Sequence, residues 1–186
     1  MELKNEFEVA LPPAEAWAVL LDIERIAPCM PGAGLTETVD ERTYRGKVSV
    51  RLGPVALSFD GTAIFEEVDD AAMRARVKAE GAESKGRGGA AATVVFQLEP
   101  AGDGSKVTVE TDLNLSGSVA QYGRGVGLIQ NIAGQLISQF SDNLKAEIAS
   151  TDSAQAAPPA PARPVSVFAL FGAALKDWLA RLFGRT

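Results

Sequence analysis

The feature that most constrains the fold is an alternation of apolar and polar side chains with a period of two residues, which runs from Leu35 to Ser116. In the segment YRGKVSVRL, for example, Tyr44, Val48 and Val50 alternate with charged or small polar neighbours. Similar runs are VALSFDGTAIFEEV, MRARVKAE, AATVVFQLE and KVTVETDLNLS, and they are separated by the turn signals Gly53-Pro54, Asp69-Asp70, SKGRGG and Gly102-Asp103-Gly104. This pattern predicts an antiparallel meander with one face in contact with solvent.

Two helical patterns flank the alternating region. A first strand is predicted over residues 2–11, and after Pro12-Pro13 the segment AEAWAVLLDIERIA has apolar residues at helical spacing. Residues 119–149 carry a wider apolar stripe of period 3.6, formed by Val126, Ile129, Ile132, Leu136, Phe140, Leu144 and Ile148. The order of strand, helix, several strands and one long helix predicts an α+β architecture with the sheet curled around the last helix.

The 186-residue chain divides into three segments by composition. Residues 1–149 form the predicted domain, and residues 150–164 form a linker rich in proline and alanine. Residues 165–186 are an apolar segment with interspersed charges. An extended proline-rich linker spans about 3.1 Å per residue, so this one is expected to reach roughly 40 Å.

The last segment is amphipathic when it is wound as a helix. Its apolar face consists of Phe168, Phe171, Leu175, Trp178, Leu179 and Leu182, and its polar face carries Lys176, Asp177, Arg181 and Arg185. The apolar run is too short to span a bilayer, and a helix of this kind is typical of an interfacial membrane anchor. A groove on a partner protein or on the chain's own domain is the alternative binding place.

The composition excludes several classes of chemistry. There is no histidine, so Ser-His-Asp and Cys-His nucleophilic centres and the usual zinc ligands are excluded. The acidic pairs Glu66-Glu67 and Asp69-Asp70 flank a predicted turn, and we interpret them as solvated. Cys29, the one cysteine, is predicted to be a small buried side chain rather than a reactive thiol. A net charge of −6 disfavours nucleic acid as a partner.

Two glycine-rich stretches have competing interpretations. Gly123, Gly125 and Gly127 follow a GxGxG spacing without a βαβ unit, which does not fit a nucleotide-binding loop. They either leave space beneath the long helix or allow its close packing on the sheet. The loop SKGRGG, with Lys85 and Arg87, is either a flexible hairpin tip or a site where backbone amides bind an anion.

Three segments of the sequence resemble the CoxG family of carbon monoxide dehydrogenase subunits, within the START-like, helix-grip superfamily. They are PPAEAWAVLLDIERIAPCMPGA, YRGKVSVRLGPV and GSVAQYGRGVGLIQNIAGQLISQF, and together they extend the match over roughly residues 1–149. The most specific positions are Trp17, Pro31-Gly32, Gly53-Pro54-Val55 and Ala120-Gln121-Tyr122-Gly123. The resemblance implies a seven-stranded antiparallel sheet that grips the long helix around an apolar cavity. It also implies an association with molybdenum-containing carbon monoxide dehydrogenases or related hydroxylases, in their maturation or membrane attachment.

From the resemblance and the tail together we expect a membrane-associated accessory protein without catalytic residues or a metal site. Its expected ligand is a respiratory isoprenoid quinone, such as menaquinone or ubiquinone, which it would present to the dehydrogenase. The predicted cavity residues are Phe59, Phe65, Val94, Phe96, Leu113, Tyr122, Val126, Ile129 and Phe140. Among them, Tyr122 carries a phenol that is able to hydrogen-bond a quinone oxygen.

The expected location is the cytoplasm, peripheral on the inner face of the cell membrane, because the first residues lack the apolar centre of a signal peptide. The alternative function is a recruitment or maturation adaptor that joins the dehydrogenase to the membrane without a bound ligand. An enzyme of the cyclase or hydrolase kind is disfavoured by the absence of histidine.

Overall fold

A computed structural model of the protein describes residues 1–52, 55–124 and 126–156. Within these ranges the strands are β1 Glu2–Val9, β2 Ala33–Thr38, β3 Thr43–Leu52, β4 Val55–Asp69, β5 Arg74–Glu83, β6 Gly88–Ala101 and β7 Gly104–Gly117. The helices are α1 Pro13–Leu21, α2 Ile23–Ile26 and α3 Val126–Ala156, together with the 3₁₀ turns η1 Ala27–Cys29 and η2 Ser118–Arg124. These elements follow the predicted order of strand, helices, strands and one long helix.

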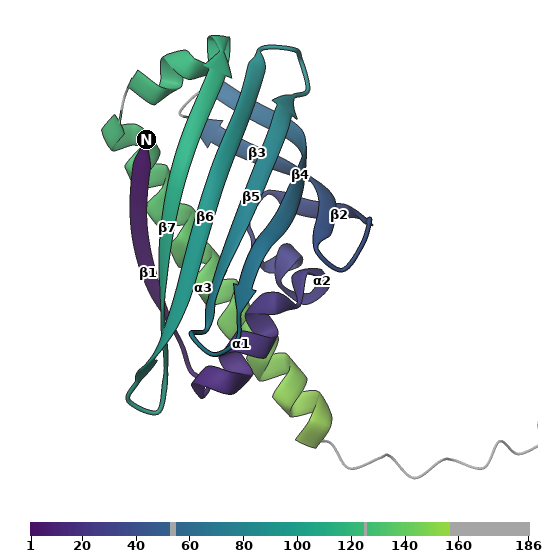
Figure 1. The fold of residues 1–186 in the computed structure, drawn as a ribbon, viewed down its shortest axis with the longest axis vertical. Coiled ribbons are helices and arrows are strands. Elements are labelled where there is room, and N and C mark those ends of the chain that lie inside the picture. Colours follow the sequence, from purple (N-terminus) through teal and green to yellow (C-terminus); the bar gives the residue numbers. More distant parts are fainter. Residues whose placement is uncertain (53–54, 125, 157–186) are drawn as a thin grey trace, which may run out of the picture. The chain divides into compact units, whose positions relative to one another are not determined.

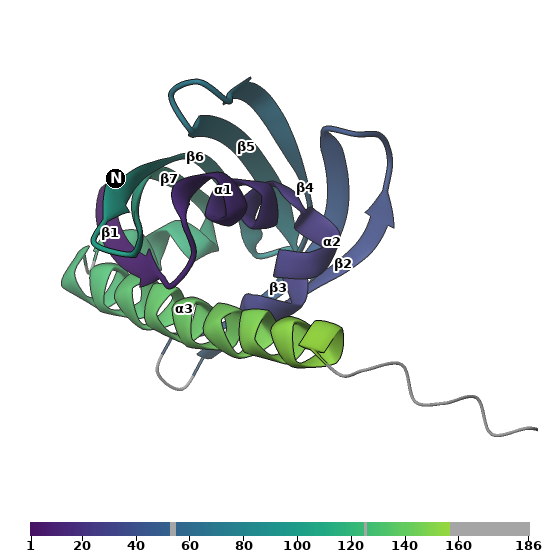
Figure 2. The ribbon, with the colours of Figure 1, turned by 90° about the horizontal axis from the view of Figure 1, so that it is seen from below.

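The strands form one antiparallel sheet in the order β1-β7-β6-β5-β4-β3-β2. The first strand pairs with the last, and Phe7 on β1 lies opposite Val107 on β7. Seen from below, the sheet is an arc with α3 across its open side and α1 inside the arc (Figure 2), and α1 and α2 lie toward the lower end of the sheet in Figure 1. This arrangement confirms the predicted α+β helix-grip architecture with a seven-stranded sheet.

The larger of two hydrophobic clusters lies at the α1 end of the sheet. There the rings of Phe7 and Phe140 meet edge to face with centroids 5.5 Å apart, and Trp17 packs against Phe96. The indole Nε1 of Trp17 also donates a hydrogen bond of 2.8 Å to Asp70 Oδ1 in the β4–β5 turn. Helix α1 is therefore held to the sheet by both apolar packing and a directed polar contact.

The smaller cluster lies at the other end of the sheet, where β7 leads into η2 (Figure 1). Its buried members are Leu3, Leu52, Leu57, Val119 and Ile129. Helix α3 contributes to both clusters, because Phe140, Leu144 and Ile148 belong to the larger one and Ile129 to the smaller. The space between these clusters is where the candidate site forms.

Polar contacts fix the second half of α3. The amide Nδ2 of Asn143 donates to the carbonyl oxygen of Cys29 at 2.9 Å, and Arg25 pairs with Glu147 at 3.4 Å. Helix α3 continues to Ala156, past the predicted domain end at residue 149.

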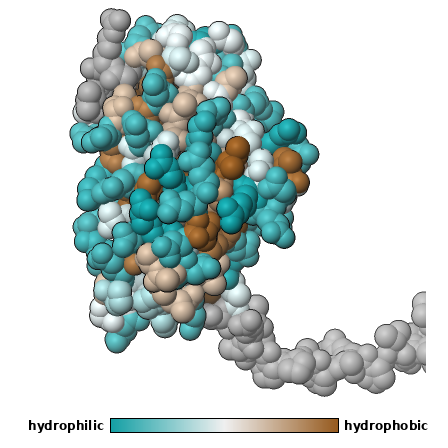
Figure 3. Space-filling view, viewed as in Figure 1, coloured by the Kyte–Doolittle hydropathy of each residue, from teal (hydrophilic) through white to brown (hydrophobic). Residues whose placement is uncertain are grey.

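Residue contacts divide the chain into Met1–Ser150 and Thr151–Thr186. Residues 157–164 of the predicted linker and the whole predicted amphipathic segment, 165–186, lie outside the described residues. The sheet face in view in Figure 3 is mainly hydrophilic, with separate hydrophobic spots. The alternating pattern thus places its polar side chains on this outer face.

Candidate functional site

A cavity of about 430 Å³ lies between the inner face of the sheet and α3. This volume falls within the range of about 300–1,000 Å³ that is usual for small-molecule pockets. Leu3, Leu52, Leu57, Val119 and Ile129 of the smaller cluster all line it, and Ile132 and Leu136 extend the wall along α3. Val48 lines the cavity and is also 41% exposed, so the cavity opens to solvent beside β3.

Two rows of very small residues cross the inner face of the sheet and make the space. In the first row Gly46 pairs with Gly61, Gly61 with Gly81, and Gly81 with Ala90 across strands β3 to β6. The second row, two residues along each strand, consists of Ala63, Ala79 and Ala92, and the same registers place the larger Tyr44 and Leu113 at its two ends. All of these residues line the cavity. Because these positions carry no large side chains, they leave volume for a ligand between the sheet and α3.

Gly61 has a second role, in the curvature of the sheet. A Cβ atom at this position would lie 2.9 Å from the Cα of Gly81 and would also overlap the carbonyl oxygen of Glu80. Both atoms belong to the backbone of β5, so no side-chain rotation relieves the overlap. The glycine therefore permits a close approach of β4 and β5, and its absent side chain also enlarges the cavity.

The lining is almost entirely apolar. Arg45 and Lys47 belong to the lining strands, but Arg45 pairs with Glu37 at 2.8 Å and Lys47 with Asp60 at 3.1 Å, all with exposed side chains. These charged ends are therefore engaged on the outer face. The site has the character of a binding pocket for an apolar molecule.

Tyr44 is the one tyrosine among the residues that line the cavity. Its hydroxyl donates to the backbone carbonyl of Glu41 at 2.9 Å, so this donor is directed to the β2–β3 turn. Burial raises the pKa of the Tyr44 phenol above its usual value, with nearby carboxylates such as Glu24 adding to the effect. The phenol therefore stays neutral near pH 7.

The nine predicted cavity residues are not all at the cavity. Phe59, Leu113 and Ile129 line it. Phe65 and Phe140 are buried in the larger cluster, Val94 and Phe96 pack against that cluster, and Tyr122 packs against the smaller one. Val126 begins α3, and its side chain lies outside the part of the chain that the structure describes.

The difference has a simple cause. Alternation assigns a side chain to the inner face of a strand, but the position along the strand decides whether it meets packed core or open space. Phe59 and Phe65 both point inward from β4, and Gly61 and Ala63 lie between them. The missed signal was the small residues at alternate positions, as in Gly61-Thr62-Ala63, Ala79-Glu80-Gly81 and Ala90-Ala91-Ala92.

The acidic pairs Glu66-Glu67 and Asp69-Asp70 make hydrogen bonds and ion pairs with neighbouring residues of the same hairpin. Asp69 accepts hydrogen bonds from the backbone amides of Ala71 and Ala72, which closes the β4–β5 turn. Glu66 pairs with Arg76 at 3.1 Å on the outer face. Within the described ranges no group of three or more His, Cys, Asp or Glu side chains is placed to hold a metal ion.

Cys29 is 5% exposed and belongs to the larger cluster. Burial raises the pKa of its thiol, with Glu147 adding to the effect. A thiol with a raised pKa is a weak nucleophile near neutral pH. The side chain acts as a small buried group, as the sequence predicts.

The glycines of the YGRGVG stretch are described only in part. Gly127 is exposed, and a Cβ atom there would meet no atom within 4 Å. Close packing on the sheet therefore does not explain this glycine. The surroundings of Gly123 and Gly125 lie outside the described residues.

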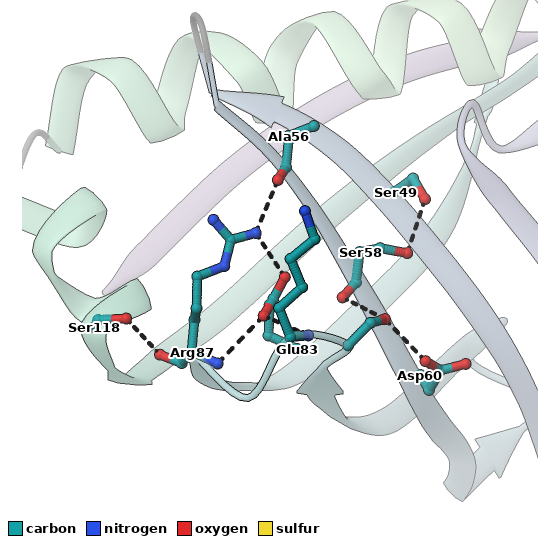
Figure 4. A network of polar contacts seen from close by, with 9 residues as sticks. Ser49, Ala56, Ser58, Asp60, Glu83, Arg87 and Ser118 are labelled. Carbon is teal, nitrogen blue, oxygen red and sulfur yellow. Dashed lines mark hydrogen bonds and ion pairs between the residues drawn. The ribbon is translucent and has the colours of Figure 1, made fainter.

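The SKGRGG loop brings its amides to a carboxylate of the chain itself. Glu83 Oε2 accepts from the backbone N–H of Lys85 at 2.8 Å and of Arg87 at 3.2 Å. Its Oε1 accepts from the guanidinium of Arg87 at 2.7 Å (Figure 4). The guanidinium and the two amides lower the pKa of Glu83 to about 2. The amides that an external anion would need are thus already bonded.

The predicted membrane residues, Phe168 to Arg185, lie outside the described part of the chain. None of the helices that the structure does describe combines the length and apolar character needed to cross a bilayer.

Comparison with known proteins identifies the family. A model of the CoxG family of carbon monoxide dehydrogenase subunits matches residues 6–149. A conserved protein from Geobacillus kaustophilus has a similar structure, with a TM-score of 0.70 and 22% identity over 81% of this chain and 97% of that one. The Zhui aromatase/cyclase from Streptomyces sp. R1128 has a TM-score of 0.60 and 11% identity over 85% and 99% of the two chains.

At these identities the structural neighbours share the fold alone, and no curated protein sequence matches the chain significantly. The family model, in contrast, covers nearly all of the domain that contains the cavity. The chain therefore belongs to the CoxG family of carbon monoxide dehydrogenase subunits.

Proposed function

We propose that this protein carries an isoprenoid quinone, menaquinone or ubiquinone, between the membrane and a molybdenum-containing carbon monoxide dehydrogenase or a related hydroxylase. The observation that carries the proposal is the apolar cavity of about 430 Å³ in a domain of the CoxG family. The protein itself catalyses no reaction in this scheme. Its task is to shield an apolar electron carrier from water on the way to a redox enzyme.

The volume of the cavity sets the part of the ligand that fits. If each non-hydrogen atom takes about the 30 Å³ that a water molecule occupies in the liquid, the cavity holds on the order of 14 such atoms. The substituted ring of a quinone has about this size. Burial of each carbon of the isoprenoid tail contributes roughly 0.8 kcal/mol to the binding free energy. A tail that leaves the cavity through the opening beside β3 therefore adds to the affinity wherever an apolar surface covers it.

The segment 165–186 supplies the proposed membrane contact. Its six large apolar side chains on one helical face and its cationic opposite face suit the interface of an anionic bilayer. The preceding proline-rich linker allows the domain to move while the segment stays at the surface. This attachment is needed because a quinone with a long tail has very low solubility in water.

The family name supports the dehydrogenase as partner, because the family model describes a subunit of that enzyme. Carbon monoxide oxidation releases two electrons, and a quinone accepts two together with two protons. A carrier that presents a quinone to the enzyme would join these half-reactions. The alternative is an adaptor that only recruits the enzyme to the membrane.

The test is mass spectrometry of an organic extract of the full-length protein, purified without detergent from a quinone-producing host. The carrier proposal expects an isoprenoid quinone near one molecule per chain. Liposome flotation of the full chain and of a chain that ends at residue 156 tests the anchor separately. A protein that floats with liposomes but contains no quinone, and takes none up from them, would contradict the carrier and favour the adaptor.

A further inference from the structure

The opening of the cavity has an exposed apolar side chain at its edge. Among the described residues that line the cavity, Val48 is the one that faces inward and is nevertheless exposed, at 41%. Its neighbour along the inner face of β3 is Gly46 of the first row, and its partner on β2 is Ala33. Both neighbours are very small, so the sheet leaves the opening clear on this side of Val48.

The other sides of the cavity are closed by packing among the described residues. At the α1 end, aromatic rings of the larger cluster meet edge to face. At the η2 end, the buried members of the smaller cluster close the space between the sheet and α3. Along the β1 side of α3, Ser141 Oγ donates to the carbonyl oxygen of Glu8 at 3.5 Å, and a Cβ atom at Gly134 would lie 3.8 Å from Asn5 Oδ1. The opening beside β3 is therefore the most direct route for a ligand.

Hydrogen bonds hold the backbone around this opening in place. The N–H of Ser49, next to Val48, donates to the carbonyl oxygen of Gly32 at 2.7 Å and joins the start of β2 to β3. A Cβ atom at Gly32 would overlap the carbonyl oxygen of Ser49, so the two segments approach closely. On the helix side, Asn143 Nδ2 donates to the carbonyl oxygen of Cys29 and ties η1 to α3. Because this backbone is fixed on both sides, the Val48 side chain is the group that can move aside for a ligand.

We propose that Val48 is the gate of the cavity: the ligand enters and leaves beside β3, and the Val48 side chain sets the rate of both steps. This inference rests on the proposed carrier function and extends it to the route of loading and release. A β-branched side chain has few rotamers, so Val48 holds a defined position at the opening. A carrier needs a passage of this kind because it must take up its ligand from one partner and give it to another.

The experiment measures the kinetics of menadione binding to the full chain. Menadione carries two carbonyl oxygens on a methylated two-ring skeleton and represents the ring of the quinone. Isothermal titration calorimetry gives the affinity, and stopped-flow measurement of tryptophan fluorescence, which quinones quench, gives the association and dissociation rate constants. Val48→Phe adds four carbon atoms at the opening, and we expect both rate constants to fall about tenfold. Val48→Ala removes two carbon atoms, and both rate constants should rise about threefold.

The signature of a gate is that the rates change much more than the affinity. A group that obstructs the passage raises the barrier to entry and to exit by the same amount, so the ratio of the two rate constants is preserved. We therefore expect the dissociation constants of both variants to stay within about threefold of the wild type, whereas loss of an ordinary contact acts mainly on dissociation. Since Val48 is exposed, neither substitution should disturb the core.

Val39→Phe is the matched control. Val39 is also an exposed valine, at 43%, but it lies between β2 and β3 and does not line the cavity. Its substitution adds the same four carbon atoms to the same hairpin. Both rate constants should equal those of the wild type.

The outcomes separate the gate from the carrier function. If the wild type binds menadione and both Val48 variants exchange it at the wild-type rates, the ligand uses another route and the inference is wrong, while the carrier function stands. If Val48→Ala changes the dissociation rate constant alone, Val48 is an ordinary contact and not a gate. A wild type that binds no menadione would remove the carrier function and the gate together.

Discussion

Filling the cavity from its floor is the most direct perturbation of this site. Ala92 lies in the second row of small residues, between Ala79 and Leu113 on the neighbouring strands. Ala92→Phe adds six carbon atoms, about 180 Å³ at roughly 30 Å³ for each atom-sized group. Of a cavity of about 430 Å³, about 250 Å³ would remain, enough for on the order of eight atoms. Menadione, with about 13 non-hydrogen atoms, would then no longer fit.

The fold should tolerate the same change. Burial of six carbons gains at most about 5 kcal/mol at roughly 0.8 kcal/mol each, and overpacking costs about 1–3 kcal/mol. We therefore expect the free energy of unfolding in urea to stay equal or to rise, while calorimetry shows at least tenfold weaker menadione binding. The result is specific because stability and binding are predicted to respond in different directions.

The matched control is Ala82→Phe. Ala82 is exposed on the outer face of β5 and lies opposite Asp60 of β4, so the added ring cannot enter the cavity. Menadione affinity should be unchanged. If Ala92→Phe remains folded and binds menadione as the wild type does, the cavity is not the binding site and the reasoning is wrong.

Two further predictions concern stability. Gly134→Ala should raise the free energy of unfolding in urea by about 1 kcal/mol, because alanine favours a helix over glycine by that amount. The added Cβ would meet nothing closer than Asn5 Oδ1 at 3.8 Å. A loss of stability would show that α3 needs a glycine at this position. The pKa of Glu83 is lowered from 4.5 to about 2 by Arg87 and backbone amides, so its contribution to stability is complete above pH 4.5 and disappears as the pH falls toward 2. Urea titrations at several pH values should therefore show the stability difference between wild type and Glu83→Gln shrinking over that interval, and a constant difference would contradict the assignment.

The architecture was predictable because its signals are local. Alternation in the β3 to β7 region, the proline pair before α1 and the apolar stripe of α3 each determine the hydrogen-bonding and burial pattern of their own segment. The absence of histidine is likewise a property of composition. The family pattern added the strand number and the cavity as expectations, and these agree with the sheet and the pocket.

The contents of the site depended on longer-range geometry. Phe65 and Phe140 have the same inward pattern as Phe59 and Ile129, yet the first two fill the larger core cluster and the last two line the cavity. Small residues on β3, β4, β5 and β6 are scattered between positions 46 and 92, and only the strand register aligns them into rows.

Arg87 shows the same limit on the sequence. As part of SKGRGG it has the composition of a solvated hairpin tip, and no local pattern pairs it with a buried carboxylate. Glu83, the carbonyl of Ala56 and the hydroxyl of Ser118 contact Arg87 only after β4, β5 and η2 have assembled. The sequence by itself determined the helices and strands, because these follow from patterns among neighbouring residues. It also excluded histidine-dependent chemistry, because that follows from composition. The tertiary structure decided where the cavity lies and which groups Arg87 contacts, because both arise from residues far apart in the chain.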